Sequence, residues 1–414
     1  MKSRKIALCL FIACTIVISC NSNSAIQASP QSENKTATTV FTLIPPPEPT
    51  ITPTYTPTIL PTITPFSSDE PGLIVTLGEE KPGPWWPGVP VFSPDGKIIA
   101  LASESIRFWN VQTHELILEL TYSHSEGCRL ANAKFSSDGK LFAASSTQCW
   151  DGEPGYVMIW ELASGKLLYK WEQAYAKMPP TSPNDTEGYS IPVSSLAFIP
   201  NSSVLVFGSG NSIEIVDALN VEVMDTLHLG PKMFASQLSI SADGRLAYMI
   251  MGWDKTNDFP VNWKTKHVLQ IWNINTHAML REVKYPEGEN FNFILLDKSL
   301  VKVDFDNETN QLIDLVTDEI FNLPYRTGWR YFNSDGRYIL FARIFTLESE
   351  GDSFELWDIQ SGNNIYTFMP DFGPDWIYGM HDIVFNPDTS ILAIAHQERV
   401  SLWYISPATK PNQP

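Results

Sequence analysis

Two cysteines, Cys128 and Cys149, are the residues of the folded region whose spacing best suits a covalent reaction. Cys128 precedes one predicted strand and Cys149 follows the next, with a turn at Ser136–Gly139 between them. In the expected hairpin register Ala133 lies near Phe142, which places the two cysteines within two positions of facing each other. A disulfide is geometrically reasonable there and would contribute about 3 kcal/mol by closing a short loop. Two unpaired thiols are the alternative.

Catalytic and metal-binding patterns are weak. His124, His267 and His381 could approach one face of the fold, but they share no spacing, so each is expected to be an ordinary surface or strand-end residue. The acidic run 304–308 lacks the glycine and the distal glutamate of a calcium loop. No Gly-x-Ser-x-Gly nucleophile motif occurs. We therefore expect no metal site, no cofactor and no enzymatic activity.

Aromatic residues are concentrated in segments expected to be long loops on one face: 81–88, 148–155, 173–190, 252–267, 346–352 and 370–379. Exposed aromatic side chains on a rigid scaffold are typical of surfaces that contact a protein, a peptide or a sugar. The alternative is that these side chains pack on one another and close the loops. The candidate binding face consists of Trp85, Trp86, Trp150, Tyr175, Tyr189, Trp253, Phe259, Trp263, Phe372 and Trp376.

The charge balance excludes one class of partner. The chain has 414 residues and a formal net charge of −18, and loss of the basic leader described below would leave about −21. An acidic surface without a basic stripe repels phosphate backbones, so nucleic acid is not an expected partner.

The first twenty residues are expected to form an export signal. A basic start at residues 1–5 precedes the apolar run Ile6–Ile18, which is too short to span a bilayer comfortably. The sequence Val17-Ile18-Ser19-Cys20 resembles the lipobox of bacterial lipoproteins. The resemblance implies cleavage before Cys20, acylation of that cysteine, and attachment to the lipid bilayer on the extracytoplasmic side, at the cell surface or in the periplasm. An ordinary secretory signal cleaved near Ser24-Ala25 is the alternative.

Residues 21–70 are expected to form a disordered stalk rich in threonine and proline. Proline recurs at every fourth position from Pro49 to Pro65, and each ring fixes φ and removes a backbone donor. Such a segment favours extended chain and could hold a domain on the order of 100 Å from its anchor. It is predicted to be a simple spacer, with O-linked sugars as an alternative use of its threonines.

From residue 71 to 406 a four-strand pattern recurs. Asp-Gly turns mark the hairpins at Ser93–Gly96, Ser136–Gly139, Ser241–Gly244 and Asn333–Gly336, because glycine adopts positive φ without steric cost. A third strand follows each hairpin, often ending in tryptophan plus a polar residue: Ile106–Trp109, Val157–Trp160, Ile213–Val216, Leu269–Trp272, Phe354–Trp357 and Val400–Trp403.

These units resemble the WD-repeat family, in which the third strand ends in Trp-Asp. Trp357-Asp358 is the only literal match, and the Gly-His of the family's buried hydrogen-bond network is missing. The resemblance implies an all-β fold, a seven-bladed β-propeller of four-stranded antiparallel blades. Residues 291–325 supply the seventh, irregular unit, with neither Trp nor Asp-Gly. The strand Leu73–Leu77 should pair beside Val400–Ile405 and close the ring, leaving 407–414 as a disordered tail.

Fold and composition together favour a non-enzymatic binding or scaffold protein that is displayed outside the cytoplasm and binds a protein, peptide or glycan. One alternative is a propeller enzyme, similar to a hydrolase or lactonase, acting on an extracellular small molecule. Another is an envelope-assembly lipoprotein, by analogy with other propellers.

Overall fold

The structure is a computed structural model of the whole chain. It describes residues 71–78, 88–122, 130–146, 155–172, 176–177, 190–191, 195–229, 233–241, 245–255, 263–274, 276, 278–284, 291–295, 300–306, 309–314, 320–323, 329–334, 336–343, 353–369, 380–396 and 399–405. Contacts divide the chain into Met1–Ile44, which lies outside these residues, and Pro45–Pro414, which contains every strand.

The described strands form seven four-stranded antiparallel sheets and one two-stranded ribbon. Sheet 1 contains β2 (Val89–Phe92), β3 (Ile98–Ala102), β4 (Ile106–Asn110) and β5 (Leu116–Leu120). Sheet 2 contains β6 (Leu130–Phe135), β7 (Leu141–Ser146), β8 (Tyr156–Glu161) and β9 (Lys166–Glu172). Sheet 3 contains β12 (Leu196–Phe198), β13 (Val204–Ser209), β14 (Ser212–Asp217) and β15 (Glu222–His228).

Sheet 4 contains β16 (Met233–Ile240), β17 (Arg245–Lys255), β18 (Trp263–Asn273) and β19 (Ala278–Lys284). Sheet 5 contains β20 (Phe291–Leu295), β21 (Leu300–Asp306), β22 (Thr309–Asp314) and β23 (Ile320–Leu323). Sheet 6 contains β24 (Trp329–Phe332), β25 (Tyr338–Arg343), β26 (Ser353–Asp358) and β27 (Asn363–Phe368). Sheet 7 contains β28 (Met380–Phe385), β29 (Ile391–His396), β30 (Arg399–Tyr404) and β1 (Gly72–Leu77), and the ribbon pairs β10 (Ala176–Lys177) with β11 (Ser190–Ile191).

The expected pairing of the first strand with the last is confirmed. β1 runs antiparallel to β30, with Gly72 opposite Tyr404 and Leu77 opposite Val400. The six predicted third strands are β4, β8, β14, β18, β26 and β30, and the irregular region 291–325 forms sheet 5. Sheet 7 is therefore built from both ends of the repeat region, so its outermost strand comes from the start of that region.

Turns between the first and second strands have the backbone shape that their sequences predict. Gly96, Gly139 and Gly336 adopt φ of 70°, 69° and 71°. The equivalent turns of sheets 3 and 7 place Asn201 and Thr389 in the same left-handed region, at 56° and 61°. That region is unusual for a β-branched residue such as threonine, so the surrounding structure must hold the turn in place.

The polar residue that ends β4, β14, β18 and β26 caps the following turn, which explains why it is polar. Asn110 Oδ1 accepts hydrogen bonds from the N–H groups of Gln112 and Thr113, both at 2.8 Å. Asp358 Oδ1 accepts from the Ser361 N–H at 2.9 Å. Such side-chain caps stabilise tight turns, so the polar position serves the connection to the fourth strand.

A β-bulge recurs at the tryptophan position between third and fourth strands. Shifts in register occur at Trp109, Trp160, Trp272 and Trp357, and at the equivalent Val216. In sheet 7 the shift lies between Leu73 and Val75, opposite the Trp403 end of β30. The pair β22–β23 of sheet 5 shows no such shift between Asn310 and Ile313. A bulge bends the outer strand and disrupts flat edge-to-edge association with another sheet. The bulge at the tryptophan position therefore protects the outer edge of the sheets that contain it.

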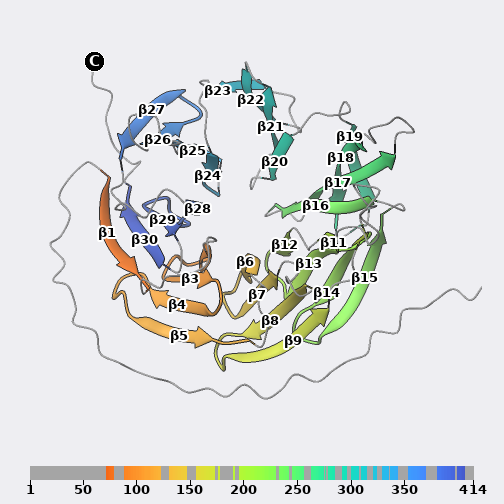
Figure 1. The fold of residues 1–414 in the computed structure, drawn as a ribbon, viewed down its shortest axis with the longest axis horizontal. Helices are drawn as coiled ribbons and strands as arrows, with labels where there is room; N and C mark the ends of the chain where they lie inside the picture. The colour runs from red at the N-terminus through yellow and green to blue at the C-terminus, as the bar shows by residue number, and fades with distance from the viewer. Residues whose placement is uncertain are drawn as a thin grey trace, which may run out of the picture. The chain divides into compact units, whose positions relative to one another are not determined.

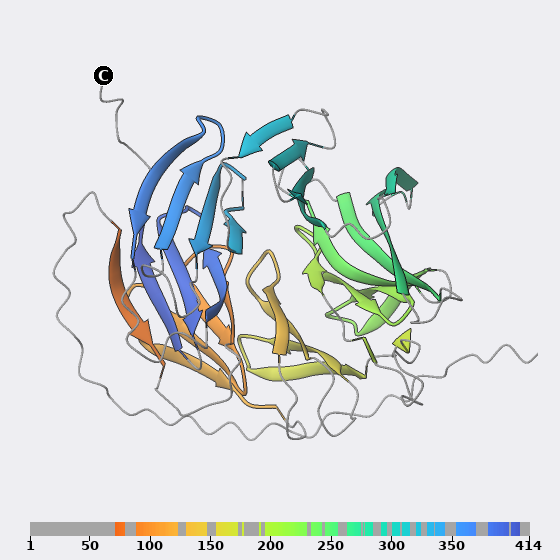
Figure 2. The same cartoon turned by 45° about the horizontal axis from the view of Figure 1, so that its top comes forward.

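Neighbouring sheets pack face to face, and their first strands contact one another. β2 contacts β6 and β28, β12 contacts β6 and β16, β16 contacts β20, and β24 contacts β28 (Figures 1 and 2). Apolar clusters fill the spaces between sheets 1 and 2, 2 and 3, 3 and 4, 6 and 7, and 7 and 1. In the last of these clusters Ile99 and Trp109 pack with Leu402, so the two ends of the repeat region share one core.

Two details of the sequence prediction are wrong. Ala133 pairs with Ala144, and Phe142 pairs with Phe135, because the hairpin is closed by the Ser136 N–H and the Leu141 carbonyl and so has a longer turn than Ser136–Gly139. Segment 252–267 is not a loop throughout, since β17 continues to Lys255 and β18 begins at Trp263. Local turn signals could not show either feature, because both depend on how one strand is aligned with the next.

Candidate functional site

Most residues of the predicted binding face lie outside the described residues. These are Trp85, Trp86, Trp150, Tyr175, Tyr189, Phe259, Phe372 and Trp376. Cys20, Cys128 and Cys149, and with them the lipid attachment and the disulfide, are outside as well. Trp253 lies in β17 and Trp263 in β18, so these two predicted residues are brought onto one hairpin.

The β17–β18 hairpin extends beyond the rest of sheet 4. Each strand has 11 residues, whereas β13 and β14 of sheet 3 have 6 each. Pairing with β16 stops at Gly252, and pairing with β19 stops at Val268. The register continues past both points, with Trp253 opposite Thr265 and Lys255 opposite Trp263. Trp253 and Trp263 therefore occupy positions on the same face of the outer part of the β17–β18 hairpin. This outer part pairs with neither β16 nor β19.

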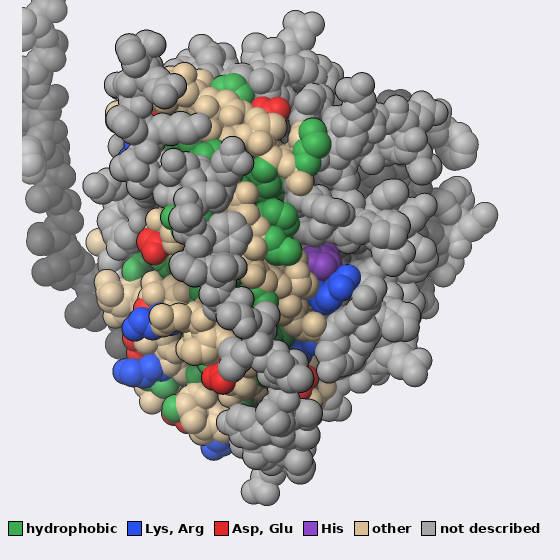
Figure 3. Space-filling view, turned by 90° about the vertical axis from the view of Figure 1, so that its left-hand side faces the viewer, with side chains coloured by type: hydrophobic (Ala, Val, Ile, Leu, Met, Phe, Trp, Pro, Cys, Tyr) green, Lys and Arg blue, Asp and Glu red, His purple; other side chains and the backbone are tan. Residues whose placement is uncertain are grey.

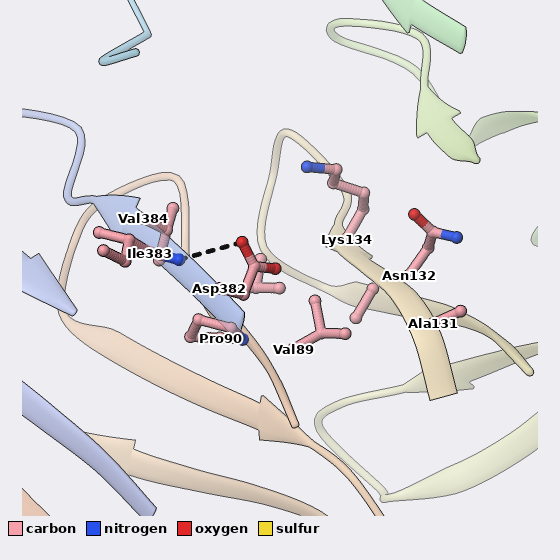
Figure 4. Close-up of a pocket in the computed structure, with 10 residues that line it drawn as sticks. Val89, Pro90, Ala131, Asn132, Lys134, Asp382, Ile383 and Val384 are labelled. Carbon is pink, nitrogen blue, oxygen red and sulfur yellow. Dashed lines mark hydrogen bonds between the residues drawn. The ribbon is translucent and has the colours of Figure 1, made fainter. Parts of the chain in front are cut away.

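A second candidate site is a cavity of about 200 Å³ where the first strands of sheets 7, 1 and 2 meet. Its lining comes from β28, β2 and β6 (Figure 4). The polar side chains are Asp382, Lys134 and Asn132, and the rest of the lining is apolar or alanine. Figure 4 shows Asp382 on one wall and Lys134 with Asn132 on the facing strand.

Backbone bulges position the polar side chains of this cavity. β6 shifts register between Leu130 and Asn132, and β28 shifts between Met380 and Asp382. Asn132 and Asp382 each come directly after the register shift of their strand. Each also lies four residues before the residue that opens the following turn, Ser136 or Asn386. Bulges re-aim side chains and are frequent near functional sites. The same local device therefore presents Asn132 and Asp382 to one cavity.

Asp382 is a carboxyl group with little compensation for its burial. Its Oδ1 accepts one hydrogen bond from the Ile383 N–H at 3.0 Å. Burial raises its pKa to about 6, although the positive charge of Lys134 and the Ile383 N–H both act to lower it. Burial also raises the pKa of Tyr331 on β24, and the charge of Asp382 adds to that shift. The carboxyl group is therefore held in an environment that disfavours its charge.

Lys134 faces Asp382 without pairing with it. Among the described residues no ion pair or hydrogen bond is found for its ammonium group, and the residue is exposed to solvent. Desolvation lowers the pKa of Lys134, and the charge of Asp382 acts in the opposite direction. The cavity thus holds one cationic and one anionic group, neither of which is neutralised by direct contact.

Another titratable group in sheet 7 is fully bonded. His396 Nε2 lies 2.8 Å from Ser401 Oγ, and Ser401 Oγ lies 2.9 Å from Thr76 Oγ1, so the chain of hydrogen bonds joins β29, β30 and β1. Burial lowers the pKa of His396 to about 4, and the charge of Arg399 adds to the effect. With Ser401 only 2% exposed, a substrate cannot reach this Ser–His pair. Its role is to connect the first and last strands of the repeat region.

The outer strands expose apolar pairs that the sequence did not single out. They lie at the bulges, where two residues of the outer strand oppose one of its neighbour. Figure 3 shows hydrophobic surface among charged groups on the side where β1 lies. The exposed large apolar residues of the outer strands are Leu73, Leu116, Ile117, Val223, Met224, Met279 and Leu280.

The described residues contain no group of three or more metal-ligating side chains, and no helix among them is long and apolar enough to cross a membrane. His267 lies in β18 and His381 in β28, on different sheets, and His124 is outside the described part. His267 and His381 are therefore not brought together by the strands that contain them.

Sequence reasoning missed Lys134 and Asp382. They are far apart in the chain, and only the packing of sheet 2 and sheet 7 against sheet 1 brings them together. One signal was present: each is a charged residue inside an otherwise apolar or small first strand, Leu-Ala-Asn-Ala-Lys-Phe and Met-His-Asp-Ile-Val-Phe. A charge in the innermost strand of a repeat unit marks a position that cannot be ordinary core.

Comparison with known proteins shows the fold. Neither a protein-family model nor a curated protein sequence matches the chain. Among solved structures, it is similar to a chain of the "Crystal Structure of Mitotic Checkpoint Complex", with a TM-score of 0.54 and 16% identity. The match covers 86% of this chain and 98% of that chain. The likeness, together with the four-stranded antiparallel sheets, shows a β-propeller fold.

Proposed function

We propose that the seven sheets are the blades of one closed ring, and that this ring is a non-enzymatic binding scaffold for a protein, peptide or glycan. Support for closure comes from the β1–β30 pairing and from the apolar cluster that sheets 7 and 1 share. The resemblance of residues 17–20 to a lipobox supports anchoring through Cys20 on the extracytoplasmic side of a membrane. The structural neighbour belongs to a protein complex, which favours a protein partner.

The projecting β17–β18 hairpin carries this proposal. Its outer part pairs with neither neighbouring strand, so backbone donors and acceptors stand at its edges. Exposed strand edges can accept an additional strand from a partner. Trp253 and Trp263 are on this segment, and tryptophan is enriched among residues that dominate binding energy. The hairpin therefore combines a backbone template with two candidate anchors.

Replacement of both tryptophans tests the binding face. In a crosslinking pull-down from membranes, the variant Trp253→Ala/Trp263→Ala should lose the partners that the wild type captures, while its melting temperature stays unchanged. The matched control is Leu219→Ala/Met224→Ala, which removes exposed apolar groups from sheet 3 and should capture normally. Unchanged capture by the tryptophan variant would refute this binding face.

The anchor is tested in the same preparations. A Cys20→Ser chain should leave the membrane fraction and lose metabolic labelling by an alkyne fatty acid. Retention of the label on the variant would show that Cys20 is not the lipid attachment.

A further inference from the structure

We propose that the cavity between β2, β6 and β28 binds a small zwitterion, an α-amino acid with an apolar side chain, whose carboxylate meets Lys134 and whose ammonium group meets Asp382. This site lies among the first strands of the sheets and is independent of the β17–β18 hairpin.

The arrangement of charges is the first reason. An ammonium group and a carboxyl group line one cavity but make no ion pair with each other. One oxygen of Asp382 receives the Ile383 N–H, and the described contacts leave the other without a donor. The carboxyl group of Asp382 is partly removed from water with this single described donor, which is unfavourable for its charged form. A ligand with both charges would satisfy the two groups together.

A singly charged ligand fits less well. An anion at Lys134 would bring a second negative charge toward Asp382. A cation at Asp382 would bring a second positive charge toward Lys134. Each would leave one protein charge without compensation after the ligand had displaced water. The acidic chain, at −18, gives further reason to disfavour a free anion.

The size and lining of the cavity define the rest of the ligand. Val89, Val91, Ile383 and Val384 supply apolar wall, and Asn132 supplies an amide. A volume of about 200 Å³ holds several water-sized groups, at about 30 Å³ each, and is below the roughly 300–1,000 Å³ of sites for drug-sized ligands. An amino acid such as valine or leucine is of matching size, and its side chain would contact the apolar wall.

Binding of the amino acid should depend on pH through the protonation of Asp382. The carboxyl group must be ionised to bind an ammonium ion, and its pKa is raised to about 6. Lys134 on β6 and Tyr331 on β24 are the other titratable groups that interact electrostatically with Asp382. Binding should therefore weaken as the pH falls below about 6.

Calorimetric titration of the full chain at pH 7.5 tests the proposal with three probes. L-leucine carries both charges, N-acetyl-leucine only the negative one, and leucinamide only the positive one. Leucine should bind at least ten-fold more tightly than either blocked probe. Lys134→Met and Asp382→Asn should each weaken leucine binding at least ten-fold, whereas Lys97→Met and Asp95→Asn, which remove a charge pair from an exposed turn, should not.

Three results would overturn the proposal: no heat of binding for leucine, equal binding of the three probes, or leucine binding that neither Lys134→Met nor Asp382→Asn changes. Circular dichroism of each variant confirms that it is folded before titration. Lys134 makes no described hydrogen bond or ion pair, so its replacement keeps the test decisive even where Asp382→Asn perturbs the strand.

Discussion

Sheet 7 holds a buried and a half-buried titratable group, His396 and Asp382, which differ in their hydrogen-bond partners. His396 sits on β29 in a chain of hydrogen bonds to Ser401 and Thr76, and these bonds join three strands. Asp382 sits on β28, beside a cavity, with one backbone N–H as its described partner. The side chain of His396 therefore has a side-chain hydrogen-bond partner within the sheet, whereas the described partner of the Asp382 carboxyl group is a single backbone N–H.

This difference separates a group that serves the fold from a group that is available to a ligand. Buried polar groups are normally hydrogen-bonded, and an exception needs an explanation. Burial disfavours the charged form of both side chains, so it lowers the pKa of the histidine to about 4 and raises that of the aspartate to about 6. The two shifts have opposite consequences for stability.

The largest expected effect is the pH dependence of unfolding. His396 has a folded pKa of about 4 against 6.5 unfolded, so its contribution is full above pH 6.5 and is lost as the pH falls toward 4. Asp382 has a folded pKa of about 6 against 3.8, so its ionisation costs stability above pH 6, and acidification toward 3.8 removes that cost. At 1.36 kcal/mol per pKa unit, each change is about 3 kcal/mol.

Single variants separate these opposing contributions. In urea unfolding between pH 7 and pH 4, Asp382→Asn should become less stable on acidification than the wild type does. His396→Asn should show the opposite difference, gaining stability relative to the wild type. Other carboxylates act equally in both variants and cancel from the comparison. If acidification changed the stability of both variants in the same direction relative to the wild type, the contrast between Asp382 and His396 would be contradicted.

A smaller loss is expected from breaking the hydrogen-bond chain. Ser401→Ala removes the hydroxyl between His396 and Thr76 and leaves both without that partner, which should lower the free energy of unfolding by about 2 kcal/mol. Ser105→Ala is the control, because its bond to Glu119 is exposed and should contribute less than about 0.5 kcal/mol. Equal losses in the two variants would show that the chain has no special role.

The smallest effect on stability is expected in the cavity. Lys134→Met removes a charge that makes no described bond, so the free energy of unfolding should change by less than about 0.5 kcal/mol. The pKa of Asp382 should rise further, because the nearby positive charge that lowers it is gone. A loss as large as that of Ser401→Ala would place Lys134 among the residues that hold the fold.

Local signals in the sequence were sufficient for the elements of the fold. Asp-Gly turns and apolar third strands located most strands, because these features depend on a few adjacent residues. The pairing of β1 with β30 followed from an unassigned strand at one end and a missing one at the other. The irregular sheet 5 could be placed only by its apolar runs, since it has neither tryptophan nor an Asp-Gly turn.

The candidate sites were harder to predict, for a physical reason. Bulges at Asn132 and Asp382 depend on how neighbouring strands align, and no local residue pattern specifies them. The same holds for the length of the β17–β18 hairpin, where Asp254 and Lys264 continue a ladder that polar composition suggested was a loop. Cavities lined by distant repeats, such as the one that Lys134 and Asp382 share, arise only when the sheets pack.

Direct titration of the Asp382 carboxyl group by carbon-detected NMR tests the central contrast most directly. In the full chain without ligand its midpoint should lie near pH 6. Saturating L-leucine should move the midpoint to lower pH, because an ammonium ion bound at the carboxylate favours the ionised form, and N-acetyl-leucine should not. A midpoint that leucine leaves unchanged would contradict the assignment of Asp382 to a ligand site.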